Sequence, residues 1–441
     1  MSSPNPLSLF CALLLCLPLA VVFILNTAPT TPTTTSSSAA AGCGGGGGPV
    51  SIPAIPLLDA RFDIRANHEA RFLESRVPVD EPPPPPVIAG AKEDASRRPP
   101  PAPVSDDDAE DEELFRDSSA SYPPPAPVSY DDAEDEALFR VASKVSPKPK
   151  RPKKLAFMFL TTAGLPFAPL WEAYFNNTPG GLYNIYVHAD PTRLPGPRLT
   201  GVFSGRAIPS KPSRRHTPTL ISAARRLLAR ALLHDPGNAM FALLSPSCVP
   251  LRSFNFTYRT LAASRRSFIE ILKDEEGRYD RWAARGPDAM LPEVPLADFR
   301  IGSQFWALTR RHARLAVADT RLWSKFKHPC LHRRTCYPEE HYFPTLLGMR
   351  DPRGCVPCTL THVDWHGRTD GHPRTYGAEE VGPELIRRLR GERPRYGDDG
   401  ANGTGLLAAR PRSDPFLFAR KFDPGSSRAL MGMAEDVLFE D

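Results

Sequence analysis

The sequence predicts an α/β domain with a mostly parallel central sheet, preceded by a long segment of different composition. Short apolar runs alternate with helical segments in the second half of the chain, an order typical of parallel sheets. The charge also changes: residues 1–141 contain 9 Lys and Arg against 21 Asp and Glu, whereas residues 142–441 contain 46 against 29. Proline accounts for 51 of the 441 residues, which excludes a coiled coil. A hydrophobic fraction of 41% and five Trp exclude a wholly disordered chain.

A single apolar run near the N-terminus predicts a membrane anchor. Leu7–Leu25 has 19 residues without a charge, long enough for one helix to cross the hydrocarbon core of a bilayer. A cleaved signal peptide is the alternative, but its apolar core normally has about 7–15 residues and follows a basic start. Residues 1–6 contain no Lys or Arg. We therefore expect an uncleaved signal-anchor, with residues 1–6 as the cytoplasmic tail.

Residues 26–150 are expected to form a disordered, acidic, Pro-rich stem, and residues 151–441 the folded domain. The stem contains an internal repeat with a period of 24 residues. The sequence PPAPVSDDDAEDEELFR of Pro100–Arg116 recurs as PPAPVSYDDAEDEALFR in Pro124–Arg140. Two copies are too few for a solenoid. A docking motif and a duplicated acidic spacer are the two interpretations, and the spacer is the more ordinary one.

The folded domain shows its elements in order. The expected strands are residues 155–161, 182–190, 239–245 and 303–309. The expected helices are residues 170–177, 219–234 and 311–319. Residues 219–234 carry one apolar stripe, with Arg225, Arg226 and Arg230 beside it. Asp190 stands at the carboxyl end of the second strand, where ligands bind in open parallel sheets.

Five of the eight cysteines fall in the folded domain: Cys248, Cys330, Cys336, Cys355 and Cys358. The last four have the spacing C-x5-C and C-x2-C, so a zinc site is one interpretation. A domain behind a membrane anchor would lie in an oxidising compartment, and this favours disulfides instead. The sequence leaves their pairing open. Three Asn-x-Ser/Thr sites, at Asn176, Asn255 and Asn402, are compatible with such a compartment.

Eight segments between Lys154 and Asp423 carry a family resemblance. They are KLAFMFLTTAG, YNIYVHADP, FALLSPSCVPL, GSQFWALTRRHA, CYPEEHYFPTLL, THVDWHG, HPRTY and FLFARKF, in this order. Together they resemble the core-2/I-branching β-1,6-N-acetylglucosaminyltransferase family in its plant-type branch. The resemblance implies a type II Golgi membrane protein whose lumenal domain has a GT-A-like glycosyltransferase fold. It implies inverting transfer of a sugar from a UDP-sugar to a hydroxyl of a glycan or glycoprotein, without a metal or other cofactor.

The expected independence from metal agrees with one feature of the sequence. Many glycosyltransferases of the GT-A type hold the donor diphosphate through a cation on an Asp-x-Asp motif, and none occurs after Lys150. Fixed positive side chains can stabilise the departing diphosphate instead. The resemblance assigns this role to Arg374 in HPRTY and Lys421 in FARKF. Both residues are also compatible with ordinary surface charges in a basic domain.

An inverting transfer needs one carboxylate that accepts the proton of the attacking hydroxyl. The resemblance assigns this general base to Glu340 in CYPEEHYFP, with Glu339 as its acidic neighbour. Adjacent side chains on a helix point about 100° apart, so the two carboxylates should not share one role. Pro338 and the two glutamates also suit an ordinary helix start.

Two further positions follow from the resemblance. Asp190 corresponds to a contact with the uridine part of the donor, and Trp365 to an aromatic platform on the acceptor side. A turn-forming Asp before Pro191 and a core Trp are the ordinary alternatives. The chain departs from its plant relatives at Arg215–Thr217, where they usually carry a Trp-Gly pair, and at SPSCVPL, where they usually carry SESCIPL.

Three classes of function compete at this point. The first is a Golgi glycosyltransferase, with N-acetylglucosamine as the expected donor sugar, and xylose or glucuronic acid as alternatives within the family. The second is a catalytically silent, membrane-tethered binding or scaffold protein on the same fold, which the altered loop at Arg215–Thr217 would suit. The third is a nucleic-acid binder, suggested by the basic domain. It lacks an aromatic-basic motif, and the anchor places it in the wrong compartment, so we expect no nucleic-acid partner.

Overall fold

The structure of the protein, a computed structural model, describes residues 132–161, 164–176, 178–193, 199–332, 335–368, 372–398 and 412–441. The predicted anchor Leu7–Leu25, the first copy of the repeat and most of the predicted stem lie outside these residues. Within the described ranges, no helix has both the length and the apolar composition needed to cross a membrane.

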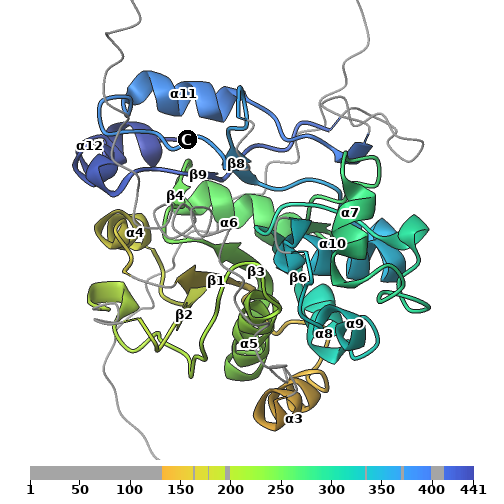
Figure 1. Cartoon of the computed structure of the whole chain (residues 1–441). Helices are drawn as coiled ribbons and strands as arrows, with labels where there is room; N and C mark the ends of the chain where they lie inside the picture. The colour runs from red at the N-terminus through yellow and green to blue at the C-terminus, as the bar shows by residue number, and fades with distance from the viewer. Residues whose placement is uncertain are drawn as a thin grey trace, which may run out of the picture. The chain divides into compact units, whose positions relative to one another are not determined.

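A mixed sheet of six strands forms the centre of the domain (Figure 1). Its order is β2-β1-β3-β6-β5-β7. The strands are β1 (Lys154–Thr161), β2 (Tyr183–Ala189), β3 (Asn238–Leu244), β5 (Ser267–Phe268), β6 (Ala307–Thr309) and β7 (Cys355–Val356). β1 pairs in parallel with both β2 and β3, and β5 with β7, whereas β6 is antiparallel to β3 and β5. The predicted α/β fold with a mostly parallel sheet is thus confirmed, with β6 as the reversed strand.

Helices cover both faces of the sheet, and alternate side chains of β1 accordingly enter two separate cores. Leu155, Phe157 and Phe159 contribute to one core, whereas Ala156 and Met158 contribute to the other. The first core lies against α4 (Ala168–Phe175), α6 (Phe254–Ala263), α11 (Pro383–Gly391) and α12 (Ser427–Gly432). The second lies against α3 (Ala133–Ala142), α5 (Thr219–His234), α8 (Arg310–Ala318), α9 (Trp323–Phe326) and α10 (Pro338–Arg350). A near-continuous apolar strand such as β1 is the expected sequence of a strand buried on both faces.

The remaining elements are short. A second sheet has three strands in the order β4-β9-β8, namely β4 (Val249–Pro250), β9 (Phe418–Arg420) and β8 (Thr361–Val363). The helix α7 spans Arg278–Trp282. Single turns of 3-10 helix occur at Gly201–Phe203, Ala283–Arg285, Leu296–Asp298, Pro352–Gly354 and Pro424–Ser426, and a π-helical turn at Ala434–Leu438.

Most predicted elements have the expected positions. The helix at 219–234 is confirmed at both ends, but Arg225 and Arg226 beside its apolar stripe are buried, because α3 and α8 pack on that side. The strand predicted over 303–309 is shorter, and β6 keeps only its last three residues.

Cys330 and Cys336 form a disulfide, whereas Cys248, Cys355 and Cys358 are unpaired and buried. The four cysteines considered for zinc are therefore not gathered as one ligand set.

The folded domain starts earlier than the expected boundary at residue 151. The helix α3 lies in the second copy of the repeat and packs on α5 and α8. Phe139 and Ala142 of this helix are buried in the core. Composition placed this segment in the stem, because its apolar residues are few and are separated by acidic ones. The second copy of the repeat thus contributes a helix to the folded domain.

Candidate active site

The carboxyl end of β2 holds Asp190 in a rigid position. One carboxylate oxygen accepts hydrogen bonds from the amide and the hydroxyl of Thr192, at 2.8 and 2.6 Å. The other oxygen accepts a hydrogen bond from the amide of Ser213, at 2.9 Å. Burial by itself raises the pKa of Asp190, but the hydrogen bonds from Thr192 and Ser213 outweigh it and lower the pKa. Asp190 is therefore an ionised anchor for the loop that contains Ser213.

This loop connects Asp190 to the start of α10. His216 Nδ1 lies 3.0 Å from the carbonyl oxygen of Cys336, and its ring centre lies 5.0 Å from that of Tyr337. The positive charge of Arg215 acts on both Glu339 and Glu340. The segment Arg215–Thr217, at which the sequence departs from the family pattern, thus lies against the segment that carries the candidate base.

The first turn of α10 presents Glu340 toward positive side chains. Its Oε2 lies 3.3 Å from Arg281 Nη1, and its side chain is 32% exposed. Burial raises the pKa of Glu340, and the charges of Arg281, Arg215 and Arg420 offset only part of that rise. The carbonyl oxygen of the same residue accepts a hydrogen bond from the amide of Gly302, at 2.9 Å. A side chain at residue 302 would meet the carbonyl oxygen of Glu270, so only glycine fits this close approach.

Glu339 points in a different direction and is buried, with 6% of its surface exposed. Its Oε2 has no hydrogen-bond partner among the described residues. Burial, followed by repulsion from Glu340, raises the pKa of Glu339 to about 8. The two neighbouring carboxylates thus have different environments, as the predicted 100° between them requires.

Two of the C-terminal cations lie at the carboxyl end of β9, the middle strand of the small sheet. Lys421 follows β9 directly and is buried, with 6% of its surface exposed. Its carbonyl oxygen accepts a hydrogen bond from the amide of Tyr376, at 3.0 Å. The preceding residue, Arg420, lies over the ring of Phe305 at 4.5 Å, and its charge acts on Glu340. Lys421 therefore directly follows a residue whose charge acts on the candidate base.

Trp365 and Arg374 belong to the segment that follows β8. Trp365 is 53% exposed, so the interpretation as a core Trp is wrong. The amide of Arg374 donates a hydrogen bond to the carbonyl oxygen of Asp364, at 2.9 Å. The guanidinium group pairs with Glu380 and lies 3.9 Å from Asp364. Two carboxylates therefore already neutralise Arg374. A side chain that binds a diphosphate would be expected to have its positive charge available.

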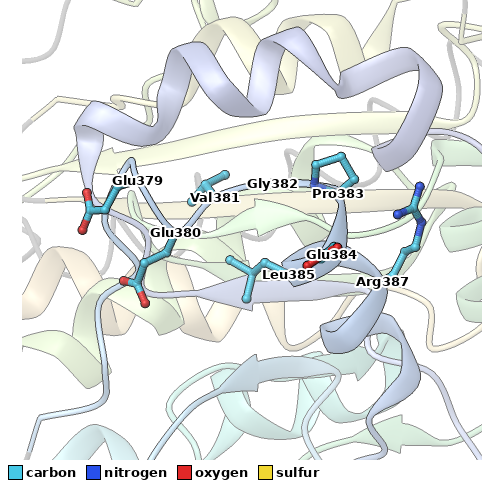
Figure 2. Close-up of a pocket in the computed structure, with 8 residues that line it drawn as sticks. All are labelled: Glu379, Glu380, Val381, Gly382, Pro383, Glu384, Leu385 and Arg387. Atoms are coloured by element: carbon cyan, nitrogen blue, oxygen red, sulfur yellow. The ribbon is translucent and has the colours of Figure 1, made fainter.

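Glu380, the partner of Arg374, also lines a shallow hollow of about 450 Å³ (Figure 2). The hollow is formed by Glu379–Pro383 and the first turns of α11. Three of its side chains, Glu379, Glu380 and Glu384, are acidic. None of the predicted site residues lines it. Arg387 is its single basic side chain, and we do not assign the hollow to the candidate site.

The structure brings together residues that lie far apart in the sequence. The charges of Arg420 and Arg215 both act on Glu340. Arg420 precedes Lys421 in the sequence, and Arg215 stands two residues after Ser213, whose amide donates a hydrogen bond to Asp190. Sequence reasoning missed Arg281 and Glu270 altogether. Burial raises the pKa of Glu270 to about 7; the charge of Arg395 offsets part of the rise, whereas Glu275 and Glu340 add to it. No local pattern marks either residue, because their roles depend on the packing of α7 and β5 against α10.

The chemistry available at this site is that of one accessible carboxylate among fixed cations. Among the described residues, no group of three or more His, Cys, Asp and Glu side chains is placed to hold a metal ion. A carboxylate with a raised pKa is a better proton acceptor, and Arg281 keeps it oriented. Arg215, Arg281 and Arg420 supply positive charge around it.

The chain is similar to a protein-family model, to a plant glycosyltransferase and to a solved glycosyltransferase structure. The family model "Branch: Core-2/I-Branching enzyme" matches residues 155–390, slightly more than half of the chain. The chain is 29% identical over 321 residues to the glycosyltransferase BC10 of Oryza sativa subsp. japonica, with 66% of this chain and 78% of the relative covered. Among solved structures, a galactosyltransferase LgtC in complex with donor and acceptor sugar analogues matches with a TM-score of 0.31 at 8% identity, covering 65% of this chain and 98% of LgtC.

Proposed function

The chain belongs to the core-2/I-branching enzyme family of glycosyltransferases, and from this premise we propose that it transfers a sugar from a UDP-sugar to a hydroxyl of a glycan or glycoprotein with inversion at the anomeric carbon. The observation that carries the proposal is the environment of Glu340. It is a partly exposed carboxylate at a helix start, oriented by Arg281 and surrounded by further positive charge.

Glu340 is the proposed general base. Its carboxylate takes the proton of the acceptor hydroxyl as that oxygen forms a bond to the anomeric carbon. The bond from this carbon to the diphosphate breaks on the opposite side, and UDP leaves with its negative charge. The raised pKa of Glu340 brings its basicity closer to neutral pH, where general base catalysis is most effective.

Positive side chains are proposed to hold the departing UDP in place of a metal ion. Lys421 is the first candidate, because it is held at the end of β9 next to Arg420, whose charge reaches Glu340. Arg374 is a second and weaker candidate, since Glu380 and Asp364 already engage its guanidinium group. Asp190 is proposed to lie at the nucleoside end of a GT-A-type donor site.

Trp365 is proposed as a platform for the acceptor sugar. Aromatic rings with an exposed face can bind the apolar faces of sugar rings, and 53% of the surface of Trp365 is exposed. Its neighbour Asp364 accepts hydrogen bonds from the hydroxyl of Tyr376 at 3.2 Å and from the amide of His366 at 2.9 Å. This fixes the backbone next to the ring.

N-acetylglucosamine is the proposed donor sugar, and the Golgi lumen the proposed location. The basis is the resemblance to the family and the uncharged run Leu7–Leu25 in the sequence. N-terminal sequencing of the mature protein tests the anchor: an intact N-terminus is expected, and cleavage near residues 39–41 would contradict it.

A donor screen tests the activity itself. Purified chain that includes Asp132 onward is mixed with UDP-sugars, and both hydrolysis and transfer to glycan acceptors are measured. The fragment must retain α3, because Phe139 and Asp135 are part of the folded domain. We expect turnover with UDP-N-acetylglucosamine that disappears in Glu340→Gln. A chain that binds UDP but turns over no UDP-sugar would instead support the silent scaffold.

A further inference from the structure

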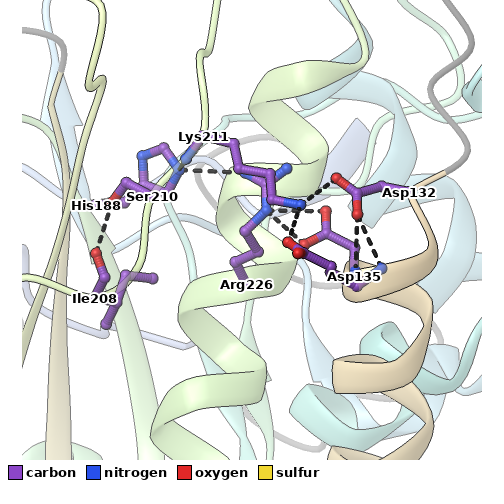
Figure 3. A network of polar contacts seen from close by, with 8 residues as sticks. Asp132, Asp135, His188, Ile208, Ser210, Lys211 and Arg226 are labelled. Carbon is purple, nitrogen blue, oxygen red and sulfur yellow. Dashed lines mark hydrogen bonds and ion pairs between the residues drawn. The ribbon is translucent and has the colours of Figure 1, made fainter.

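The helix α3 fills a groove between α5 and α8, and its central contact is a buried ion pair (Figure 3). The two carboxylate oxygens of Asp135 accept hydrogen bonds from Arg226 Nε, at 2.7 and 2.9 Å. The side chains of Arg226 and Asp135 are only 7% and 8% exposed. One turn later, the guanidinium carbon of Arg225 lies 4.4 Å from the ring centre of Phe139.

The start of α3 contacts the loop that leads to the candidate site. Asp132 accepts hydrogen bonds from the amides of Glu134 and Asp135, at 3.0 and 3.2 Å, and so caps the helix. It also pairs with Lys211, whose Nζ lies 2.9 Å from Glu134. The amide of Lys211 lies 3.4 Å from His188 Nε2, so the same loop is held from both sides.

The first copy of the repeat carries the same contact residues 24 positions earlier. Asp108, Glu110, Asp111, Leu114 and Phe115 correspond to Asp132, Glu134, Asp135, Leu138 and Phe139. Within the 17-residue repeat the copies differ only at Asp106, which is Tyr130 in the second copy, and at Glu113, which is Ala137. Ala137 is exposed on α3, so a glutamate at that position disturbs no contact in the groove.

We propose that the groove between α5 and α8 is a docking site for both copies of the acidic repeat, and that the first copy of the same chain is its second occupant. Arg226 selects the aspartate, Lys211 selects the acidic cap, and Arg225 lies over the phenylalanine ring. When the first copy replaces the second in the groove, the folded domain begins 24 residues earlier in the chain, while the contacts to Lys211 stay the same.

The second copy is the stronger occupant for two reasons. Residues 143–153 connect it to β1, whereas residues 119–153 would connect the first copy. Closing the longer loop disfavours the first copy by roughly sixfold, as the ratio of loop lengths to the power 3/2 gives. Ser118 also takes the place of Ala142, which is fully buried. The first copy therefore binds the groove more weakly, and it docks only when the second copy has lost its contacts to the groove.

Hydrogen exchange of the full chain, followed by mass spectrometry, tests the proposal. In the unaltered chain, residues 133–142 should be protected and residues 109–118 should exchange rapidly. The variant Asp135→Arg/Phe139→Ala places a like charge beside Arg226 and removes the buried ring. Protection should then move to residues 109–118, where exchange slows by at least about tenfold.

Two matched variants complete the test. Asp111→Arg/Phe115→Ala alone should change nothing at 133–142, and its combination with Asp135→Arg/Phe139→Ala should abolish protection in both copies. The proposal is overturned if residues 109–118 stay unprotected in the Asp135→Arg/Phe139→Ala chain, or if that chain loses protection throughout β1 and β3. Sedimentation at several concentrations distinguishes the partner: protection that appears only in a dimer would assign the groove to a second chain and overturn docking within one chain.

Discussion

Arg281 Nη1 lies 3.3 Å from Oε2 of Glu340, and this ion pair links the short helix α7 to the first turn of α10. The guanidinium group also lies 5.2 Å from the ring centre of Tyr337, directly before α10. Arg281 thus contacts both Tyr337 and Glu340 in the segment that carries the proposed base. The pair orients the carboxylate and offsets part of the rise in its pKa that burial causes.

Glu340→Gln should abolish most of the turnover. The amide keeps the size of the side chain but cannot accept a proton, and general base catalysis contributes about 10²- to 10⁴-fold. We expect kcat to fall by that factor with little change in UDP affinity, measured by steady-state kinetics and calorimetry. Glu339→Gln is the matched control and should retain most of the activity. Equal losses in the two variants, at unchanged melting temperatures, would show that Glu340 is not the base.

The stability of the domain should fall as the pH rises from about 5 to 8. The pKa of Glu339 is raised to about 8 by burial and by Glu340, whereas in the unfolded chain it has its ordinary value. Its protonated form stabilises the fold, and this contribution is lost as the pH rises through the folded pKa. Each unit of pKa difference corresponds to about 1.4 kcal/mol. Glu339→Gln should flatten this part of the pH profile in urea unfolding; an unchanged slope would contradict the assignment.

Lys421→Ala should weaken UDP binding by roughly tenfold or more, because a charged hydrogen-bonding group would be lost from the diphosphate site. Arg374→Ala serves as the comparison and should have the smaller effect, since Arg374 already pairs with Glu380. Isothermal titration with UDP measures both. If Lys421→Ala binds UDP as the unaltered chain does, Lys421 has no place in the donor site.

Transfer should continue in excess EDTA. The prediction rests on the absence of an Asp-x-Asp motif after Lys150 and on the fixed cations around Glu340. Initial rates with and without chelator are compared, followed by addition of Mn²⁺ or Mg²⁺. A loss of activity in EDTA that Mn²⁺ restores would refute the role proposed for the cations.

Arg226→Ala should destabilise the domain by about 3–5 kcal/mol, because it leaves the buried carboxylate of Asp135 without a partner. Lys211→Ala removes a more exposed ion pair with Asp132 and Glu134 and should cost only about 0–1 kcal/mol. Chemical unfolding of the two variants gives the difference directly. Similar losses would mean that the Arg226–Asp135 pair is not the main contact of α3.

The sequence by itself determined the elements whose side-chain pattern repeats locally. The helix Thr219–His234 and the strand at Leu155–Thr161 were predictable, because a helical stripe and a short apolar run follow from neighbouring residues alone. The place of Glu340 at a helix start was predictable, since Pro338 followed by two glutamates is also a local pattern. Its role as general base came from the family resemblance and is a proposal. Family membership followed from the order of such segments.

Only the tertiary structure decided what these elements touch. Arg225 and Arg226 are buried because α3 and α8 cover their side of α5, and no spacing within the helix indicates this. The second copy of the acidic repeat has few apolar residues, and it forms the helix α3 where Arg226 and Lys211 contact its carboxylates. Arg281 acquires its role in the same way, through contact between α7 and α10. Such partners lie tens of residues apart, so their charges and surfaces meet only once the sheet has brought the helices together.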